Sequence, residues 1–356
     1  MCSRFPVAAR GYLDFAIGEL DSLPGRVLAN RPRPVKKEIG LSIMLSRRTF
    51  LGASVAGAGL AMGSLSAARP KGLQIGVMDT VFRLPGKPES VALAKKLGLA
   101  AVQVTLGRST DGKMLPLEDP AIQAAWKKAS RDNGIPLDST YLDMLHSDCL
   151  KDNPNAPMWI RKGIEITKSL EAGILMMVFF GKCQVLQRKE LDYVAGLFKE
   201  LAPEAERAGV ILGFENTSSG EDNRYAVDKV DSKAFKMWYD VGNSTFNGYD
   251  VPNEIRMLGK DRICMFHFKD KGYLGEGQVM FPEILSAIGD IGFKGIANLE
   301  TASPSGDVEA DTRRNLAYLR KLMGRSRKTD TPVAARSADL LIRLTPRLAA
   351  FALMDA

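Results

Sequence analysis

Eight short apolar runs, separated by helix-like segments, constrain the fold of this chain more than any other feature. Most of the runs are apolar almost throughout, as expected of parallel strands that are covered on both faces. We predict strands at Leu73–Met78, Ala101–Leu106, Leu137–Leu142, Ile174–Phe180, Val210–Glu215, Phe235–Asp240, Cys264–Phe268 and Gly295–Glu300.

The intervening segments show helical periodicity, and most are followed by glycine, which commonly closes a helix. Eight strand–helix units in about 250 residues predict a (β/α)8 TIM barrel over residues 69–324. A doubly wound sheet would need a Gly-rich phosphate turn after its first strand, and Gly76-Val-Met-Asp-Thr80 is not one. We predict helices at Glu89–Leu97, Pro120–Asn133, Pro157–Ala172, Arg188–Ala208, Val251–Leu258, Phe281–Ile288 and Val308–Met323, and a weaker one from about Asp222 to Lys233.

The region before the barrel contains an export-like pattern. Arg47 and Arg48 precede a Gly- and Ala-rich apolar run that ends in Ser66-Ala67-Ala68. Residues 44–68 therefore predict a twin-arginine signal peptide and export to the periplasm or beyond, although a buried Ala/Gly helix would share this composition. Proteins exported in this way fold first, often around a cofactor, so the cysteines need not pair. We expect residues 1–43 to be a non-native or disordered extension, and residues 325–356 to be a poorly ordered or loosely docked tail.

The charge argues against a nucleic-acid partner. Residues 69–324 contain 34 basic and 34 acidic side chains, so the formal net charge of +8 belongs to the two ends of the chain. A phosphate-backbone binder is expected to have a basic footprint on its folded body. The apolar runs are too short or too impure to predict stable membrane insertion after signal cleavage. The sequence leaves open whether the chain forms a homo-oligomer.

The cysteines and histidines limit the metal chemistry. The four cysteines form no CxxC pair, which excludes zinc-ribbon and thioredoxin-type sites. The only histidines are His146 and His267, so any metal site must consist mostly of carboxylates. A His-rich trinuclear zinc nuclease is thereby excluded.

The last four predicted strands each deliver one candidate ligand at the carboxyl end, where barrel enzymes place their chemistry. These ligands are Glu215, Asp240, His267 and Glu300. Taken singly, each carboxylate could be a helix cap or an ion-pair partner, and His267 could be a core histidine. Together they would repel and desolvate one another without a cation, and the set suits Mn²⁺, Mg²⁺ or Co²⁺.

The sequence resembles the sugar phosphate isomerase/epimerase family with the xylose isomerase-like barrel, especially its ketose 3-epimerases and L-xylulose-5-phosphate 3-epimerase. The resemblance covers about residues 73 to 323. It is carried by Glu215, Tyr239-Asp-Val-Gly242, His267-Phe-Lys-Asp270, Gly275-Glu-Gly277 and Gly295-Ile-Ala-Asn-Leu-Glu300.

The resemblance implies roles for the four candidate ligands. In that family the matching residues bind one divalent metal, commonly Mn²⁺, and the two glutamates also exchange the substrate proton. Glu215 and Glu300 would then be both ligands and the catalytic pair. Asn243 stands where many members have a histidine that contacts a substrate oxygen, and Gln103 stands where the epimerases have a glutamate.

Three further residues are candidate substrate contacts. Lys269 lies two residues after His267, and His146 and Lys182 follow the third and fourth predicted strands on the same rim. It is equally consistent with the sequence that Lys269 is an exposed lysine at the end of a strand and does not contact a substrate.

The residues permit more than one function. A divalent ion that holds two adjacent oxygens of a hydroxy-ketone stabilises the enediolate formed when the α-proton leaves, which predicts a sugar isomerase or epimerase. Loss of a β-oxygen from the same species would make the protein a lyase or hydratase on a keto-sugar or keto-glycoside. A non-catalytic sugar-binding barrel is a third alternative, although it would not need two glutamates. Export favours a free carbohydrate as the small-molecule partner, because phosphorylated sugars are kept in the cytoplasm.

Overall fold

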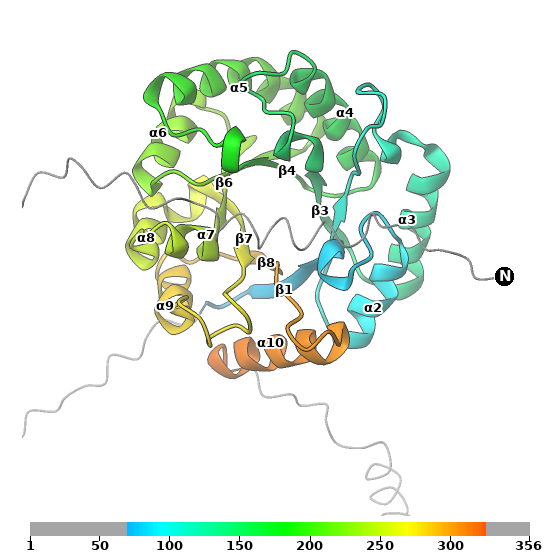
Figure 1. Cartoon of the computed structure of the whole chain (residues 1–356), viewed down its shortest axis with the longest axis vertical. Helices are drawn as coiled ribbons and strands as arrows, with labels where there is room; N and C mark the ends of the chain where they lie inside the picture. Colours follow the sequence, from blue (N-terminus) through cyan, green and yellow to red (C-terminus); the bar gives the residue numbers. More distant parts are fainter. Residues whose placement is uncertain (1–69, 325–356) are drawn as a thin grey trace, which may run out of the picture. The chain divides into compact units, whose positions relative to one another are not determined.

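The computed structural model describes residues 70–324, which form a closed barrel of eight parallel strands (Figure 1). The strands pair in chain order, and β8 pairs with β1 to close the ring. This confirms the predicted (β/α)8 TIM barrel. The strands are β1 (Leu73–Met78), β2 (Val102–Thr105), β3 (Leu137–Leu142), β4 (Ile174–Phe179), β5 (Ile211–Asn216), β6 (Phe235–Asp240), β7 (Ile263–Phe268) and β8 (Gly295–Leu299).

Each predicted strand matches an observed one, with ends that differ by no more than one residue. Burial on both faces explains this agreement. Every residue of β4 is buried, because one face meets the barrel interior and the other meets the helices. A continuous apolar run is the sequence signature of such a strand.

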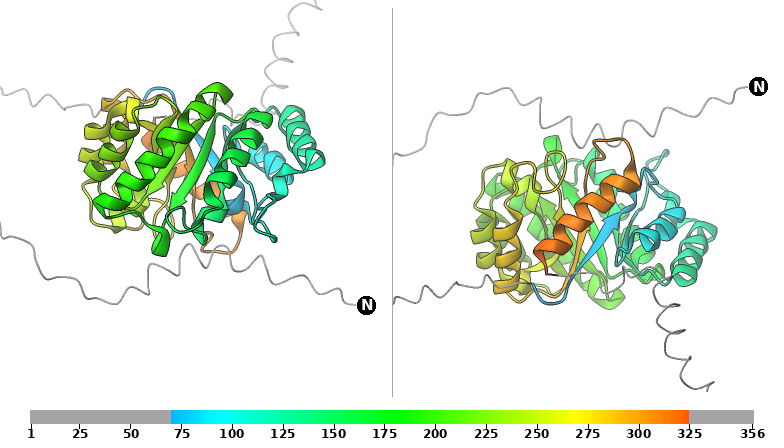
Figure 2. Two further views of the ribbon diagram at one scale, coloured as in Figure 1. Left: turned by 90° about the horizontal axis from the view of Figure 1, so that it is seen from above. Right: turned by 90° about the horizontal axis from the view of Figure 1, so that it is seen from below.

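Helices surround the strands on the outside, as the two side views of Figure 2 show. Three short 3-10 helices follow the strands β1, β3 and β4: η2 (Asp79–Phe82), η4 (Asp143–His146) and η5 (Gly181–Cys183). A fourth, η3 (Pro116–Glu118), precedes the helix α3. The α-helices are α2 (Glu89–Leu97), α3 (Pro120–Asn133), α4 (Ala156–Ser169), α5 (Arg188–Ala208), α6 (Gly220–Val230), α7 (Val241–Phe246), α8 (Val251–Arg262), α9 (Phe281–Asp290) and α10 (Val308–Leu322).

Several helices differ from the prediction. Helix α4 ends three residues earlier than predicted, at Ser169, and α8 ends four residues later, at Arg262, beyond a non-helical Gly259. The short helix α7 was not predicted, and it begins because the Asp240 side chain accepts a hydrogen bond from the backbone N–H of Asn243. Helix α6 begins and ends two to three residues earlier than predicted. The Ser219 side chain caps its start, and Asp231 adopts a left-handed conformation with φ 53° at its end.

An aromatic stack helps to join the helix layer to the strands. Phe198 of α5 packs against Phe235 at 4.6 Å between ring centroids, and Phe235 packs against Phe214 at 5.5 Å. All three side chains are fully buried. Each contributes roughly 1.5–3 kcal/mol through burial, so this side of the barrel is a rigid support for β5 and β6.

The structure pairs two cysteines that the sequence left unassigned. Cys149, after η4, forms a disulfide with Cys183 of η5, while Cys264 is a free thiol. Within residues 70–324, no helix combines the length and apolar character needed to cross a bilayer. The predicted extension, signal peptide and tail at residues 1–43, 44–68 and 325–356 lie outside the described residues.

Candidate metal centre

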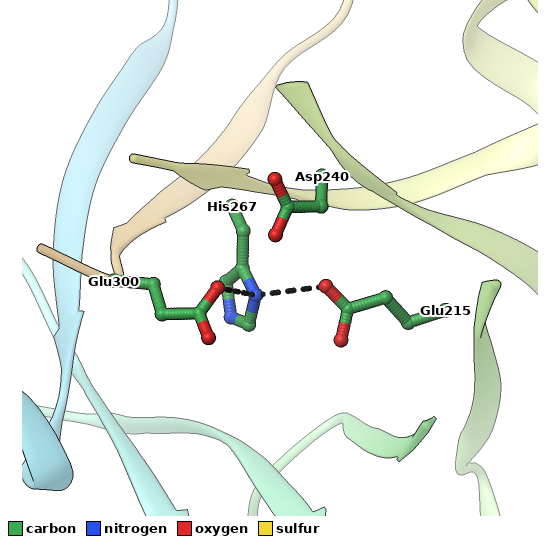
Figure 3. Close-up of side chains that lie close together, drawn as sticks. All are labelled: Glu215, Asp240, His267 and Glu300. Atoms are coloured by element: carbon green, nitrogen blue, oxygen red, sulfur yellow. Dashed lines mark hydrogen bonds and ion pairs between the residues drawn. The ribbon is translucent and has the colours of Figure 1, made fainter. Parts of the chain in front are cut away.

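The four predicted ligands converge at the carboxyl end of the barrel (Figure 3). Each of the strands β5, β6 and β7 carries one of them among its last two residues: Glu215, Asp240 and His267. Glu300 directly follows β8. Asp240 pairs with His267 in the sheet register. Strand register therefore places side chains that are far apart in the sequence at one depth of the barrel.

The four side chains form a tight and largely buried cluster. One ligand atom from each residue lies within 4.8 Å of the others. The His267 Nδ1 atom is 3.1 Å from Glu215 Oε1 and 3.2 Å from Glu300 Oε2. The side chain of His267 is fully buried, whereas that of Glu300 is 21% exposed. Glu300 is thus the cluster member most open to a substrate.

Contacts with Gln103 and Trp238 orient the imidazole ring of His267. Its Nε2 atom lies 3.1 Å from the amide oxygen of Gln103, whose own nitrogen faces Met176 Sδ at 3.4 Å. The ring also packs edge-on against Trp238. The imidazole therefore donates from Nε2 to Gln103 and presents Nδ1 to the two glutamates, as in metal-binding histidines oriented by a neighbouring acceptor.

Lys269 brings a positive charge into the cluster. Its ammonium lies 2.8 Å from Asp240 Oδ2 and 2.9 Å from Glu300 Oε2. The prediction of a substrate contact did not foresee this double ion pair with two candidate ligands. The Lys269 side chain is only 14% exposed, so the pairing takes place away from bulk water.

Burial and charge compete in setting the pKa values of the cluster. Burial lowers the pKa of His267, but Glu215 and Glu300 outweigh it and raise that pKa to about 10. Burial raises the pKa of Asp240 to about 7 despite the attraction of Lys269. Burial also acts to raise the pKa of Glu300, but Lys269 and His267 outweigh it, so that pKa lies below its usual range. Glu300 is consequently ionised at neutral pH.

The donor set fits one divalent cation. Three carboxylates and one imidazole form a hard to borderline set of ligands, suited to Mn²⁺, Mg²⁺ or Co²⁺. The three carboxylates would repel one another in this buried place without positive charge, which His267 and Lys269 supply in the described structure. Binding an ion would require proton release from His267, because a metal ligand is the neutral imidazole.

The other predicted contacts lie around the cluster in different ways. Asn243 contributes its backbone N–H, which donates to Asp240 Oδ1 at 2.8 Å. His146 ends η4, and its ring meets Phe180 edge-on at 5.6 Å. Lys182 of η5 lines a cavity formed by the segments that follow β3 and β4. The structure therefore brings together the four candidate ligands, Lys269 and the backbone N–H of Asn243.

The sequence analysis did not single out Tyr141, a residue of β3 whose side chain faces the interior of the barrel. Thr140 contacts Thr167 of the outer helix α4, so its neighbours Ser139 and Tyr141 point inward. Burial raises the pKa of the Tyr141 phenol well above its usual value, and carboxylates including Glu300 and Glu215 add to this effect. The alternation along β3 was the signal that could have found Tyr141.

The loop after β7 is organised by Asp270. Its carboxylate accepts hydrogen bonds from the backbone N–H groups of Lys271, Gly275, Gly277 and Gln278. A Cβ atom at Gly277 would lie 2.0 Å from Asp270 Oδ1, so only glycine fits there. The loop is also held to α10 by an ion pair between Glu276 and Arg314. The Gly275-Glu-Gly277 motif thus builds a fixed loop around Asp270, next to Lys269.

The fold and the clustered ligands define a (β/α)8 barrel with a candidate metal centre at the carboxyl ends of its strands. Residues 91–322 match the model of the xylose isomerase-like TIM barrel family, and the chain belongs to this family. No curated protein matches the chain significantly in sequence.

Several solved structures share this fold at low sequence identity. A D-allulose 3-epimerase from Methylomonas sp. is 17% identical, with a TM-score of 0.58 over 72% of this chain and 99% of its own. An L-ribulose 3-epimerase is 16% identical, with a TM-score of 0.59 over 76% and 98%. A 3-keto-D-glucoside 4-epimerase from E. coli is 16% identical, with a TM-score of 0.58 over 70% and 99%.

Proposed function

We propose that this chain is a divalent-metal-dependent isomerase or epimerase that moves a proton on a sugar or sugar derivative. The observation that carries this proposal is the position of Glu215 and Glu300, which flank the same nitrogen of His267 at 3.1 and 3.2 Å. Two carboxylates on either side of one ligand position can serve one substrate carbon from two directions. The sugar epimerases among the similar structures are consistent with this chemistry.

The residues that would hold the ion are Glu215, Asp240, His267 through Nδ1, and Glu300. We propose Mn²⁺ as the ion, and the same donors accept Mg²⁺ or Co²⁺. When bound, the ion supplies positive charge against the negative charge that develops on the substrate oxygens as the proton leaves.

The two glutamates divide the proton transfer. Glu300 is ionised and partly open, so it can accept the acidic proton next to the substrate carbonyl, and Glu215, after taking a proton from solvent, can deliver it from the other side. Return to the opposite face of the same carbon gives an epimer, and return to the neighbouring carbon gives the aldose or ketose isomer. The Asn243 N–H holds Asp240 in place, and Lys269, once an ion takes its position beside Asp240, would be free to meet a substrate oxygen.

A lyase or hydratase on a keto-sugar or keto-glycoside is the second candidate. It requires the same proton removal by the same pair, followed by departure of an oxygen β to the carbonyl. The 3-keto-D-glucoside 4-epimerase with the same fold supports including keto-glycosides among the candidate substrates.

We also propose that the protein is exported and meets unphosphorylated carbohydrate. The disulfide between Cys149 and Cys183 supports this, because structural disulfides persist in oxidising compartments and are rare in the cytosol. Replacing both Arg47 and Arg48 with lysine should retain the precursor in the cytoplasm, and unchanged export would contradict the signal.

Solvent exchange tests the proposed reaction. The Mn²⁺-loaded protein is incubated in D₂O with free ketoses and keto-glycosides, and the products are identified by NMR. For the first candidate we expect an epimer or isomer that carries deuterium at the carbon next to the carbonyl. For the second we expect an unsaturated product that has lost the hydrogen from that carbon. Glu300→Gln should abolish the exchange while circular dichroism shows an intact barrel. Binding of these sugars without any exchange would instead support a non-catalytic sugar-binding barrel.

A further inference from the structure

A cavity of about 300 Å³ lies on the same rim of the barrel as the candidate metal centre. It is formed by the segment after η4 together with η5, at the ends of the neighbouring strands β3 and β4. Its volume is at the lower end of the range for small-molecule pockets, which suits one additional ring rather than a whole cofactor. Its lining includes Ser147, Asp148, Cys149, Asp152, Asn153 and Lys182.

Covalent and polar contacts hold this cavity open. The disulfide from Cys149 to Cys183 ties the two rim segments together. Asp148 accepts hydrogen bonds from Ser147 Oγ at 3.0 Å and from Asn153 Nδ2 at 3.1 Å. A pre-formed wall of this kind reduces the ordering that a ligand must impose on binding.

A chain of polar contacts runs from the cavity lining to Tyr141, a residue that feels the charges of the two glutamates. Tyr141 points into the barrel near the glutamates, and its hydroxyl donates to Asp143 Oδ1 at 3.2 Å. Arg108 donates to both oxygens of Asp143, at 2.8 and 3.0 Å, and to Ser147 Oγ at 3.2 Å. Ser147 in turn lines the cavity.

The charges of the wall favour an uncharged, hydroxyl-bearing ligand. Lys182 is the cation of the cavity lining, and it is offset by the carboxylates of Asp148 and Asp152. The Arg108 guanidinium is already engaged by Asp143 in a bidentate pair. A phosphate group would face more negative than positive charge here, whereas sugar hydroxyls can donate to the carboxylates and accept from the ammonium and amide groups.

We infer that this cavity is a subsite for the second, uncharged ring of a disaccharide or glycoside whose reacting ring lies at the four-ligand cluster. The inference rests on the proposed function and names its substrate class: a glycosidically linked keto-sugar rather than a free or phosphorylated monosaccharide. The disulfide then has a functional consequence, since it fixes the wall on which the second ring rests.

Binding of matched sugars tests this subsite. The probes are fructose, the ketose disaccharides turanose, lactulose and isomaltulose, and fructose 6-phosphate, titrated calorimetrically into the Mn²⁺-loaded protein. At least one disaccharide should bind roughly tenfold more tightly than fructose, which corresponds to one or two net hydrogen bonds. Asp152→Ala combined with Asn153→Ala should bring the ratio of the fructose and disaccharide dissociation constants to about one. Asp132→Asn, an exposed carboxylate change on α3, is the matched control and should keep the ratio.

Equal binding of fructose and all three disaccharides would overturn the subsite, as would tighter binding of fructose 6-phosphate that Lys182→Ala removes. These failures differ from failure of the proposed function. If fructose exchanges deuterium without any preference for disaccharides, the reaction stands and the subsite is wrong. If a disaccharide is preferred, and the Asp152 and Asn153 changes remove that preference, the subsite stands even where no sugar exchanges deuterium.

Discussion

His267 Nε2 lies 3.1 Å from the amide oxygen of Gln103, on the opposite side of the ring from the two glutamates. Because Gln103 directs its nitrogen toward Met176, this contact selects the tautomer in which Nδ1 can act as the ligand. The residue that departs from the epimerase pattern is therefore a support of the candidate metal centre.

Replacing Gln103 with leucine should weaken metal binding, because His267 would lose the acceptor that orients it. The loss of such a partner typically costs about 10–100-fold in metal affinity. The measurement is a competition titration of Mn²⁺ against a chelating dye. Gln103→Glu, which keeps an acceptor oxygen, is the matched control and should bind Mn²⁺ more tightly than the leucine variant. Equal affinity of the leucine variant and the native protein would contradict this role.

Replacing Lys269 with methionine should strengthen metal binding and destabilise the metal-free protein. The ammonium neutralises Asp240 and Glu300 in the described structure, and its removal leaves their charges uncompensated until a cation binds. Breaking a buried ion pair of this kind costs about 3–5 kcal/mol.

Thermal unfolding in EDTA and Mn²⁺ titration measure the two effects. Lys271→Met, a neighbouring exposed lysine, is the control and should change neither quantity. A Lys269 variant with native affinity and native metal-free stability would show that this lysine does not share the metal position.

Replacing Asp138 with asparagine should flatten the dependence of stability on pH. Burial raises the Asp138 pKa from 3.8 to about 6, and its Oδ2 atom is buried without a hydrogen-bond partner. The folded chain therefore holds a proton that the unfolded chain loses, so this residue's contribution to stability is greatest below pH 3.8 and falls as pH rises through about 6. The full shift corresponds to at most about 3 kcal/mol.

Unfolding in urea at pH 4 and pH 8 measures this effect. The Asp138→Asn variant should match the native protein at the lower pH and exceed its stability at the higher pH. Asp132→Asn, an exposed carboxylate change, should follow the native curve. Parallel curves for the Asp138 variant and the native protein would mean that this carboxyl group is not destabilised by burial.

Replacing Cys149 and Cys183 with serine should lower stability by about 4 kcal/mol. The disulfide closes a loop of 34 residues, and loop closure of that length restricts the unfolded chain by about this amount. Reductant should lower the Tm of the native protein and leave the Tm of the double variant unchanged. Cys264→Ala serves as the control, since it should keep the sensitivity to reductant. A native Tm that ignores reductant would argue against the pairing.

The strands and the clustering of the four candidate ligands could be predicted because their sequence signals are local. A strand that is buried on both faces is a continuous apolar run, and the carboxyl end of such a strand fixes where Glu215 or His267 must lie. The short helix α7 was missed because six residues are too few to show helical periodicity, and its start depends on the Asp240 side chain.

The remaining contacts depend on side chains that meet across the barrel. Nothing local to Lys269 indicates that it turns toward Asp240 and Glu300, and nothing local to Gln103 indicates its contact with His267. The disulfide was neither a local sequence signal nor a wholly unpredictable contact. Cys149 and Cys183 follow neighbouring strands of the predicted barrel, so their proximity could have been inferred once the strand order was assumed.

The most direct test of the metal centre is an anomalous difference map from crystals of the protein grown with Mn²⁺. We predict one strong peak per chain, within bonding distance of Glu215, Asp240, Glu300 and the Nδ1 atom of His267, with the Lys269 ammonium displaced from its present position. A map with no peak among these four side chains, or with Mn²⁺ bound elsewhere, would contradict the account.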